Sequence, residues 1–130
     1  MIPKVIHYCW LSNDPLPEKL QLCIASWKKY LPDYKIIKWD LHRFPLDKSI
    51  WVKEAFEHKN NAFAADYIRL YALATEGGIY LDSDVEVLKS FEDLLQYPYF
   101  VCVENSPQGV EAATIGAEKG TAWICKTLEY

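Results

Sequence analysis

The sequence lacks the features that mark several classes of protein. Its 130 residues contain no block of like charge, and a net charge of −4 leaves no basic face for nucleic acid. No apolar run reaches the roughly 18 residues of a transmembrane helix, and no charged-then-apolar secretion signal opens the chain. We therefore expect a cytoplasmic protein with no integral membrane segment. Peripheral association with the inner face of a membrane is the alternative.

Closely spaced cysteines are also missing. Zinc sites usually hold two cysteines about two to four residues apart, whereas the four cysteines here are widely separated: Cys9, Cys23, Cys102 and Cys125. Each lies in apolar sequence, so we expect buried free thiols in a reducing compartment.

The composition is that of one folded domain spanning residues 1–130. Apolar residues make up 51% and charged residues 25%, so a core can form without disulfides. Strands are expected at residues 4–10, 34–39, 79–82 and 99–103, with extended chain at 85–87. Helices are expected at 17–31, 49–58, 61–76, 90–95 (capped by Ser90) and 120–128, and residues 104–116 receive no assignment. Because strands and helices alternate, we predict an α/β fold with a mainly parallel sheet.

The helix at 61–76 carries one acid and one base that share a face, Asp66 and Arg69. It is apolar nearly all round, which predicts burial, and a buried charge must be paired or meet a ligand. A surface ion pair is the alternative to ligand contact. Gly77 and Gly78 supply the positive φ angles that end a helix.

The strand that follows ends in two carboxylates, Asp82 and Asp84. Residues two apart in extended chain point the same way, so the pair offers oxygen ligands to Mg²⁺ or Mn²⁺. A solvated turn is the alternative. Trp10 ends the first strand, where α/β sheets bind ligands, and could stack on a flat base or belong to the core. The three histidines show no ligand spacing and are assigned no chemistry: His7, a core residue by its position, His42 and His58.

Residues 65–85 carry the pattern Asp-x-x-Arg…Gly-Gly-x-Tyr-x-Asp-x-Asp, and residues 4–10 read Lys-Val-Ile-His-Tyr-Cys-Trp. From residue 2 to about residue 120 the chain resembles the Asp-x-Asp sugar-transferase region of glycosyltransferase family 32. That region occurs in capsular-polysaccharide and other bacterial sugar transferases and, more distantly, in the clostridial glucosylating toxins.

The resemblance implies a GT-A-type, Rossmann-like fold, a nucleotide-sugar donor that is often UDP-linked, and retention of anomeric configuration. It also implies Mn²⁺ or Mg²⁺ at a catalytic pair. At the matching positions, Asp84 would ligate the metal and Asp82 would contact the ribose and the metal shell. Relatives often have Ser at the position of Ala65, which removes one polar donor contact.

Four further positions match the donor-binding residues of the family. Trp10 would stack on uracil, and Asp66 and Arg69 would hold the donor sugar with Tyr80 nearby. The acceptor would be a glycan or lipid-linked saccharide in bacterial polysaccharide synthesis. Family members usually continue beyond this length, so the acceptor-side part is expected outside this chain.

Two other functions remain open. One is a non-catalytic nucleotide-sugar or glycan binding module, or an inactive fragment. The other is a haloacid dehalogenase-type phosphatase, whose Asp-x-Asp usually ends the first strand and precedes Thr or Val by two residues. Glu86 occupies that last position here, which disfavours a phosphatase.

Overall fold

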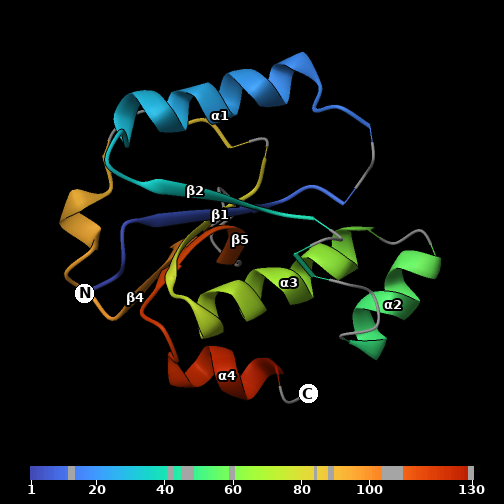
Figure 1. Ribbon diagram of the computed structural model, residues 1–130. Coiled ribbons are helices and arrows are strands. Elements are labelled where there is room, and N and C mark those ends of the chain that lie inside the picture. The colour runs from blue at the N-terminus through green and yellow to red at the C-terminus, as the bar shows by residue number, and fades with distance from the viewer. Residues whose placement is uncertain are drawn as a thin grey trace.

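The computed structural model describes residues 1–11, 14–40, 43–44, 49–58, 61–83, 85–87, 90–103 and 110–128, and the side chains of most of them (Figure 1). The helices and strands follow the expected order with one additional strand. They are β1 (Val5–Cys9), α1 (Glu18–Tyr30), β2 (Lys35–Trp39), α2 (Ile50–Glu57), α3 (Asn61–Thr75), β3 (Gly78–Leu81), a 3₁₀ turn (Glu92–Leu94), β4 (Tyr99–Val103), β5 (Val110–Ala117) and α4 (Ala122–Leu128).

The five strands form one open sheet in the order β2-β1-β3-β5-β4. β1 runs parallel to β2 and β3, whereas β5 runs antiparallel to β3 and β4. Four strands therefore point one way and β5 points the other, so the expected α/β fold with a mainly parallel sheet is confirmed. The strand that the sequence pattern did not reveal, β5, is held on both sides by neighbours, and its Gly116 leaves room for the ring of Phe100.

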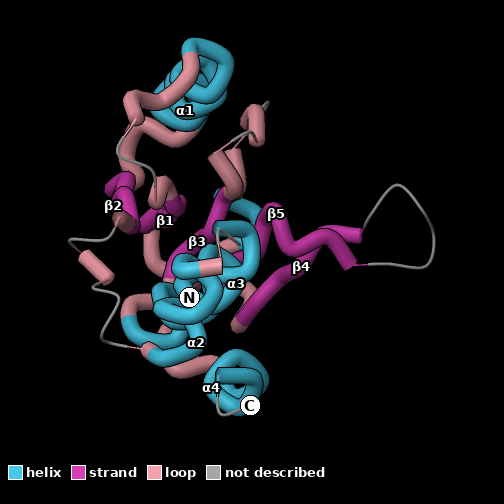
Figure 2. Tube along the Cα trace, turned by 90° about the vertical axis from the view of Figure 1, so that its right-hand side faces the viewer, coloured by secondary structure: helices cyan, strands magenta, loops and turns pink. Residues whose placement is uncertain are grey.

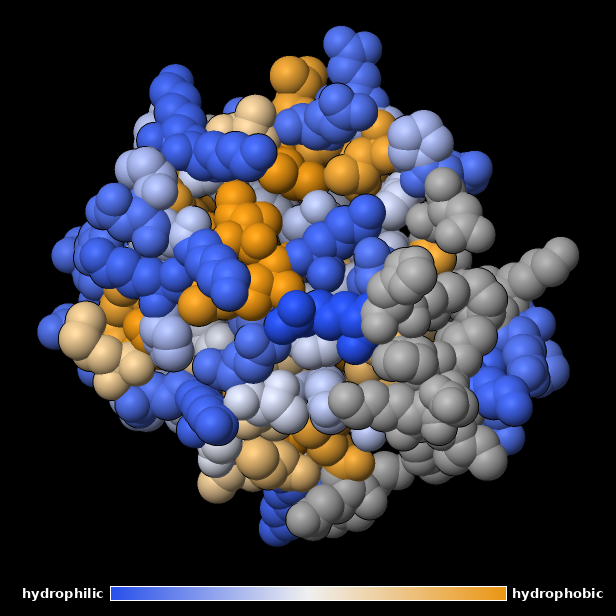
Figure 3. Space-filling view, in the orientation of Figure 1, coloured by the Kyte–Doolittle hydropathy of each residue, from blue (hydrophilic) through white to orange (hydrophobic). Residues whose placement is uncertain are grey.

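Helices cover both faces of the sheet (Figures 1 and 2). α1 lies on one face, where Trp27 packs edge-on against Tyr8 with ring centroids 5.5 Å apart. α2, α3 and α4 lie on the other face. Because successive residues of a strand face opposite sides, β3 sends Ile79 and Leu81 into the α1 core and Tyr80 into the α3 core. Apolar residues on the surface seen in Figure 3 form separate patches among hydrophilic ones.

One local expectation is wrong. Instead of a helix capped by Ser90, the chain makes one 3₁₀ turn with Phe91 at its N-cap, and the Ser90 hydroxyl accepts a hydrogen bond from the Glu92 N–H at 3.2 Å. Residues 85–87, expected as extended chain, belong to none of the described strands and are held by α1: Trp27 Nε1 donates to the Val85 carbonyl, and the Val87 N–H donates to Ser26 Oγ.

Within the described ranges, none of the helices combines the length and the apolar character needed to span a membrane.

Candidate functional site

The ends of β1 and β3 bring two of the expected site residues to one edge of the sheet. These strands are adjacent and parallel, with His7 opposite Tyr80. The chain therefore leaves the sheet at Trp10 after β1 and at Asp82 after β3 on the same side. This edge is where parallel α/β sheets bind ligands.

The turn between α3 and β3 sets where β3 begins. Gly77 has a φ of 72° and closes the helix by donating its N–H to the Leu73 carbonyl at 3.0 Å. Gly78 has a φ of 121°, and a Cβ there would lie 2.5 Å from the Val5 carbonyl oxygen. The close approach of this glycine to β1 fixes the start of the strand that precedes Asp82.

A buried histidine connects this turn to two strands. Trp39 Nε1 on β2 donates to His7 Nδ1 at 3.0 Å, so the proton of the neutral ring is on Nε2, which donates to the Gly77 carbonyl at 2.8 Å. Burial lowers the pKa of His7 below its usual 6.5 and outweighs the opposing effect of the Gly77 bond. His7 is thus a hydrogen-bonded core residue, as expected.

Arg69 is the centre of the polar cluster at the sheet edge. Its Nη2 lies 3.2 Å from Asp66 Oδ1 on the same helix and 3.2 Å from Asp82 Oδ1 after β3. Arg69 is only 8% exposed, while the side chains of Asp66 and Asp82 are 60% and 35% exposed. The guanidinium therefore lies beneath two carboxylates that face solvent. The Asp66–Arg69 pair follows from sequence spacing, whereas the link to Asp82 depends on how α3 packs on β3.

The guanidinium of Arg69 is incompletely satisfied. Its Nε–H is buried and has no hydrogen-bond partner among the residues that the structure describes. A buried donor without an acceptor costs about 1–3 kcal/mol. A bound water, an ion or another group that supplies an acceptor can satisfy a donor of this kind.

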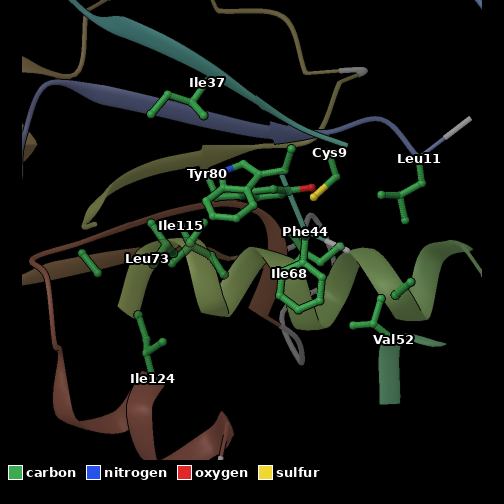
Figure 4. Close-up of a cluster of buried hydrophobic side chains, with 14 of the residues drawn as sticks. Cys9, Leu11, Ile37, Phe44, Val52, Ile68, Leu73, Tyr80, Ile115 and Ile124 are labelled. Carbon is green, nitrogen blue, oxygen red and sulfur yellow. The ribbon is translucent and has the colours of Figure 1, made fainter. Parts of the chain in front are cut away.

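Tyr80 supports Arg69 from below. The Arg69 guanidinium carbon lies 4.8 Å from the centre of the Tyr80 ring, a cation–π contact. The Tyr80 hydroxyl points at the Cys9 sulfur (Figure 4). Burial raises the pKa of Tyr80 far above its usual range and that of Cys9 to about 12, so both groups are neutral. Tyr80 is 2% exposed, and its ring and hydroxyl interact with Arg69 and Cys9. Direct contact between Tyr80 and a donor stays a prediction.

Trp10 is half-buried and lies directly after the carboxyl end of β1, at this edge of the sheet. Its Nε1 donates to the Asp14 carbonyl at 2.8 Å, and its backbone N–H donates to the Trp39 carbonyl at 3.0 Å. One part of its ring packs against the α1 core. Stacking of Trp10 on a base stays a prediction.

The expected metal site is only partly within the described residues. Asp84 lies outside them, and the residues that are described contain no cluster of three or more potential ligands. Asp82 supplies a partly exposed carboxylate at the end of a strand. Mg²⁺ and similar hard cations are commonly held by only one or two carboxylates together with substrate phosphates and water. The chemistry of this donor set therefore fits the expected cation.

Comparisons with known proteins identify the family to which the sequence is similar. Residues 17–101 match the family model described as "Glycosyltransferase sugar-binding region containing DXD motif". Inositol phosphoceramide mannosyltransferase 3 of Schizosaccharomyces pombe is 31% identical over 131 residues, which cover 98% of this chain and 36% of that protein. Mannosyl phosphorylinositol ceramide synthase SUR1 of Saccharomyces cerevisiae is 30% identical over 133 residues, covering 99% and 34%.

The fold has a counterpart among solved structures. PaToxG Glycosyltransferase superposes with a TM-score of 0.79 at 25% identity, covering 98% of this chain and 58% of that chain. The chain spans about a third of the length of the two curated relatives. The resemblance and the GT-A-type fold predicted from the sequence are both confirmed. This chain belongs to the family of glycosyltransferase sugar-binding regions that contain the DXD motif.

Proposed function

We propose that this chain forms the donor-binding part of a metal-dependent glycosyltransferase. The enzyme would move a sugar from a nucleotide-sugar, with UDP as the favoured nucleotide, to a hydroxyl acceptor with retention. The observation that carries the proposal is the Asp66–Arg69–Asp82 cluster at the ligand-binding edge of the sheet, inside the residues that match the family.

The proposed roles follow from the chemistry of each side chain. Arg69 donates to sugar hydroxyls or a phosphate through its fork of N–H groups, and the exposed carboxylate of Asp66 accepts from sugar hydroxyls. Trp10 presents a flat ring for the base. Tyr80 holds Arg69 in place through its ring.

Asp82 and Asp84 would hold Mn²⁺ or Mg²⁺. When bound, such a cation neutralises the charge of the departing diphosphate. Retention by attack from the leaving-group side needs no nucleophile from the protein. The neutral, buried states of Cys9 and Tyr80 agree with this, since neither offers an ionised nucleophile.

The acceptor that we propose is a glycan or lipid-linked saccharide in bacterial polysaccharide synthesis. The reaction would take place in the cytoplasm or at the inner face of the membrane. Two relatives are named for mannosyl transfer to inositol phosphoceramide, so mannose belongs among the sugars to test.

A binding module without turnover is the second candidate, since the Asp66–Arg69–Asp82 cluster would serve donor binding alone equally well. It would bind donor and cation but release no sugar. The phosphatase alternative is disfavoured by membership of the glycosyltransferase family.

The test is calorimetric titration of UDP and a panel of nucleotide-linked sugars, with and without Mn²⁺. Asp84→Ala is the test variant, and Asp33→Ala is the matched control, since Asp33 is exposed in the turn before β2, at the opposite edge of the sheet. We expect Mn²⁺-dependent binding that is lost in Asp84→Ala and kept in Asp33→Ala. Absence of donor binding to the parent protein would refute the proposal, and donor binding without release of sugar would identify the binding module.

A further inference from the structure

We infer that Arg69 is a switch between donor and cation: without donor it holds Asp82 and opposes cation binding, and donor binding draws it away. The two ligands would then bind cooperatively, because the cation competes with the Arg69 guanidinium for Asp82 and the donor draws that guanidinium away. This inference rests on the proposed donor site and concerns the regulation of that site.

The first argument is the charge arrangement in the absence of ligand. The Arg69 Nη2 lies 3.2 Å from Asp82 Oδ1, so the carboxylate proposed as a metal ligand is already neutralised by a cationic partner. A divalent cation held by Asp82 would lie close to this guanidinium. Because both are positive and Arg69 is 8% exposed, solvent screens their repulsion poorly.

The second argument is that Arg69 uses its donors poorly in this arrangement. One nitrogen, Nη2, serves both Asp66 and Asp82, and the buried Nε–H has no partner among the described residues. Guanidinium groups bind oxyanions best with two parallel N–H donors. A donor diphosphate or a pair of sugar hydroxyls would supply acceptors for more of the fork, so Arg69 gains by turning toward the donor.

The third argument is that little else must move. The guanidinium lies on the ring of Tyr80, which is 2% exposed and fixed in the α3 core. A cation–π contact tolerates sliding of the cation over the ring. Asp66 is largely exposed and can follow Arg69 or release it, so the exchange of partners needs no rearrangement of α3 or β3.

Cooperativity follows by linkage. If donor binding removes Arg69 from Asp82, the donor must tighten cation binding, and the cation must tighten donor binding by the same factor. Arg69 then accounts for a measurable share of that factor.

The experiment measures Mn²⁺ affinity directly, from the electron paramagnetic resonance signal of free Mn²⁺, with and without saturating UDP. Arg69→Gln is compared with the parent protein and with Arg43→Gln. Arg43 is a matched control because it forms an exposed ion pair with Glu76 at 2.9 Å. Circular dichroism checks the fold, and Arg69→Met, which retains an apolar stem, replaces Arg69→Gln if that variant does not fold.

We expect Arg69→Gln to bind Mn²⁺ about 5- to 10-fold more tightly than the parent protein without UDP, the lower part of the usual range of coupling between sites. With UDP the gain should vanish, so the factor by which UDP tightens Mn²⁺ binding becomes smaller. Arg43→Gln should match the parent protein in both states.

Two results would overturn the inference while leaving the donor site intact. One is unchanged Mn²⁺ affinity without UDP. The other is equal tightening with and without UDP, which would be a plain charge effect. If the parent protein binds neither Mn²⁺ nor UDP, the proposed donor site and the switch both fail.

Discussion

Replacing Gly78 with alanine tests whether the turn before β3 determines the position of the site. Gly78 has a φ of 121°, which L side chains rarely adopt, and a Cβ would lie 2.5 Å from the Val5 carbonyl and 3.3 Å from His7 Nε2. Backbone strain of this kind costs about 1–3 kcal/mol, and crowding in a packed core costs a further 1–3 kcal/mol. Since alanine also restricts the unfolded chain slightly, we expect a net loss of about 3 kcal/mol.

Gly120→Ala is the matched control, because it makes the same chemical change without the crowding. Gly120 has a φ of 75°, but a Cβ there would meet no atom within 4 Å. Left-handed backbone alone costs about 1–2 kcal/mol, and the restricted unfolded chain offsets part of this. We therefore expect a loss of about 1 kcal/mol or less.

Urea unfolding followed by tryptophan fluorescence gives both free energies of unfolding. A difference of about 2 kcal/mol between the variants corresponds to roughly a 30-fold change in the unfolding equilibrium. Equal losses in the two variants would refute the reasoning, because they would mean that contact between Gly78 and β1 adds nothing to backbone strain. A loss in Gly78→Ala with a changed urea dependence would instead report an altered unfolded or native state.

Three further predictions concern the buried polar groups. Tyr80→Phe keeps the ring under Arg69, so its UDP affinity in titration should stay within about twofold of that of the parent protein, whereas Tyr80→Leu should bind UDP more weakly. Equal UDP affinities of the two variants would show that the Tyr80 ring does not hold Arg69 in its binding position. The folded-state pKa of His7 is lowered, so its contribution to stability is complete above about pH 6.5 and is lost as pH falls toward the folded-state value. Urea unfolding between pH 7.5 and 5.5 should therefore show a steeper loss of stability in the parent protein than in His7→Gln, and parallel curves would contradict this assignment. Burial raises the pKa of Cys9 to about 12, so at pH 8 a thiol reagent detected by mass spectrometry should label the more exposed Cys125 well before Cys9; early labelling of Cys9 would show that its environment is open.

Much of the fold could be predicted because its signals are local. Helical periodicity locates α1, and the paired glycines mark the end of α3 because only glycine accepts φ angles of 72° and 121° at little cost. The short apolar run before Asp82 predicts β3. The strand-helix-strand opening predicts the parallel pair of β1 and β2.

The expected helix after Ser90 and the unassigned strand β5 show where local pattern is insufficient. The sequence of β5 has little alternation, and it forms a strand because β3 and β4 satisfy its backbone groups on both sides. Likewise, residues 85–87 have strand-like alternation but bond to Trp27 and Ser26 of α1. β3 is remote in sequence from β5, and α1 is remote from residues 85–87, so no local signal identifies these partners.

Some features of the candidate site follow from the sequence, and others depend on the tertiary structure. By itself, the sequence determined the residue types, the family pattern, the shared helix face of Asp66 and Arg69, and the sheet edge to which Asp82 belongs. Only the tertiary structure decided that Arg69 also bonds Asp82, that Tyr80 lies beneath Arg69, and that His7 joins Trp39 to the Gly77 turn. The physical reason is that spacing along one element places side chains relative to its own axis. Contacts between elements depend on strand order and on how closely α3 packs against β3.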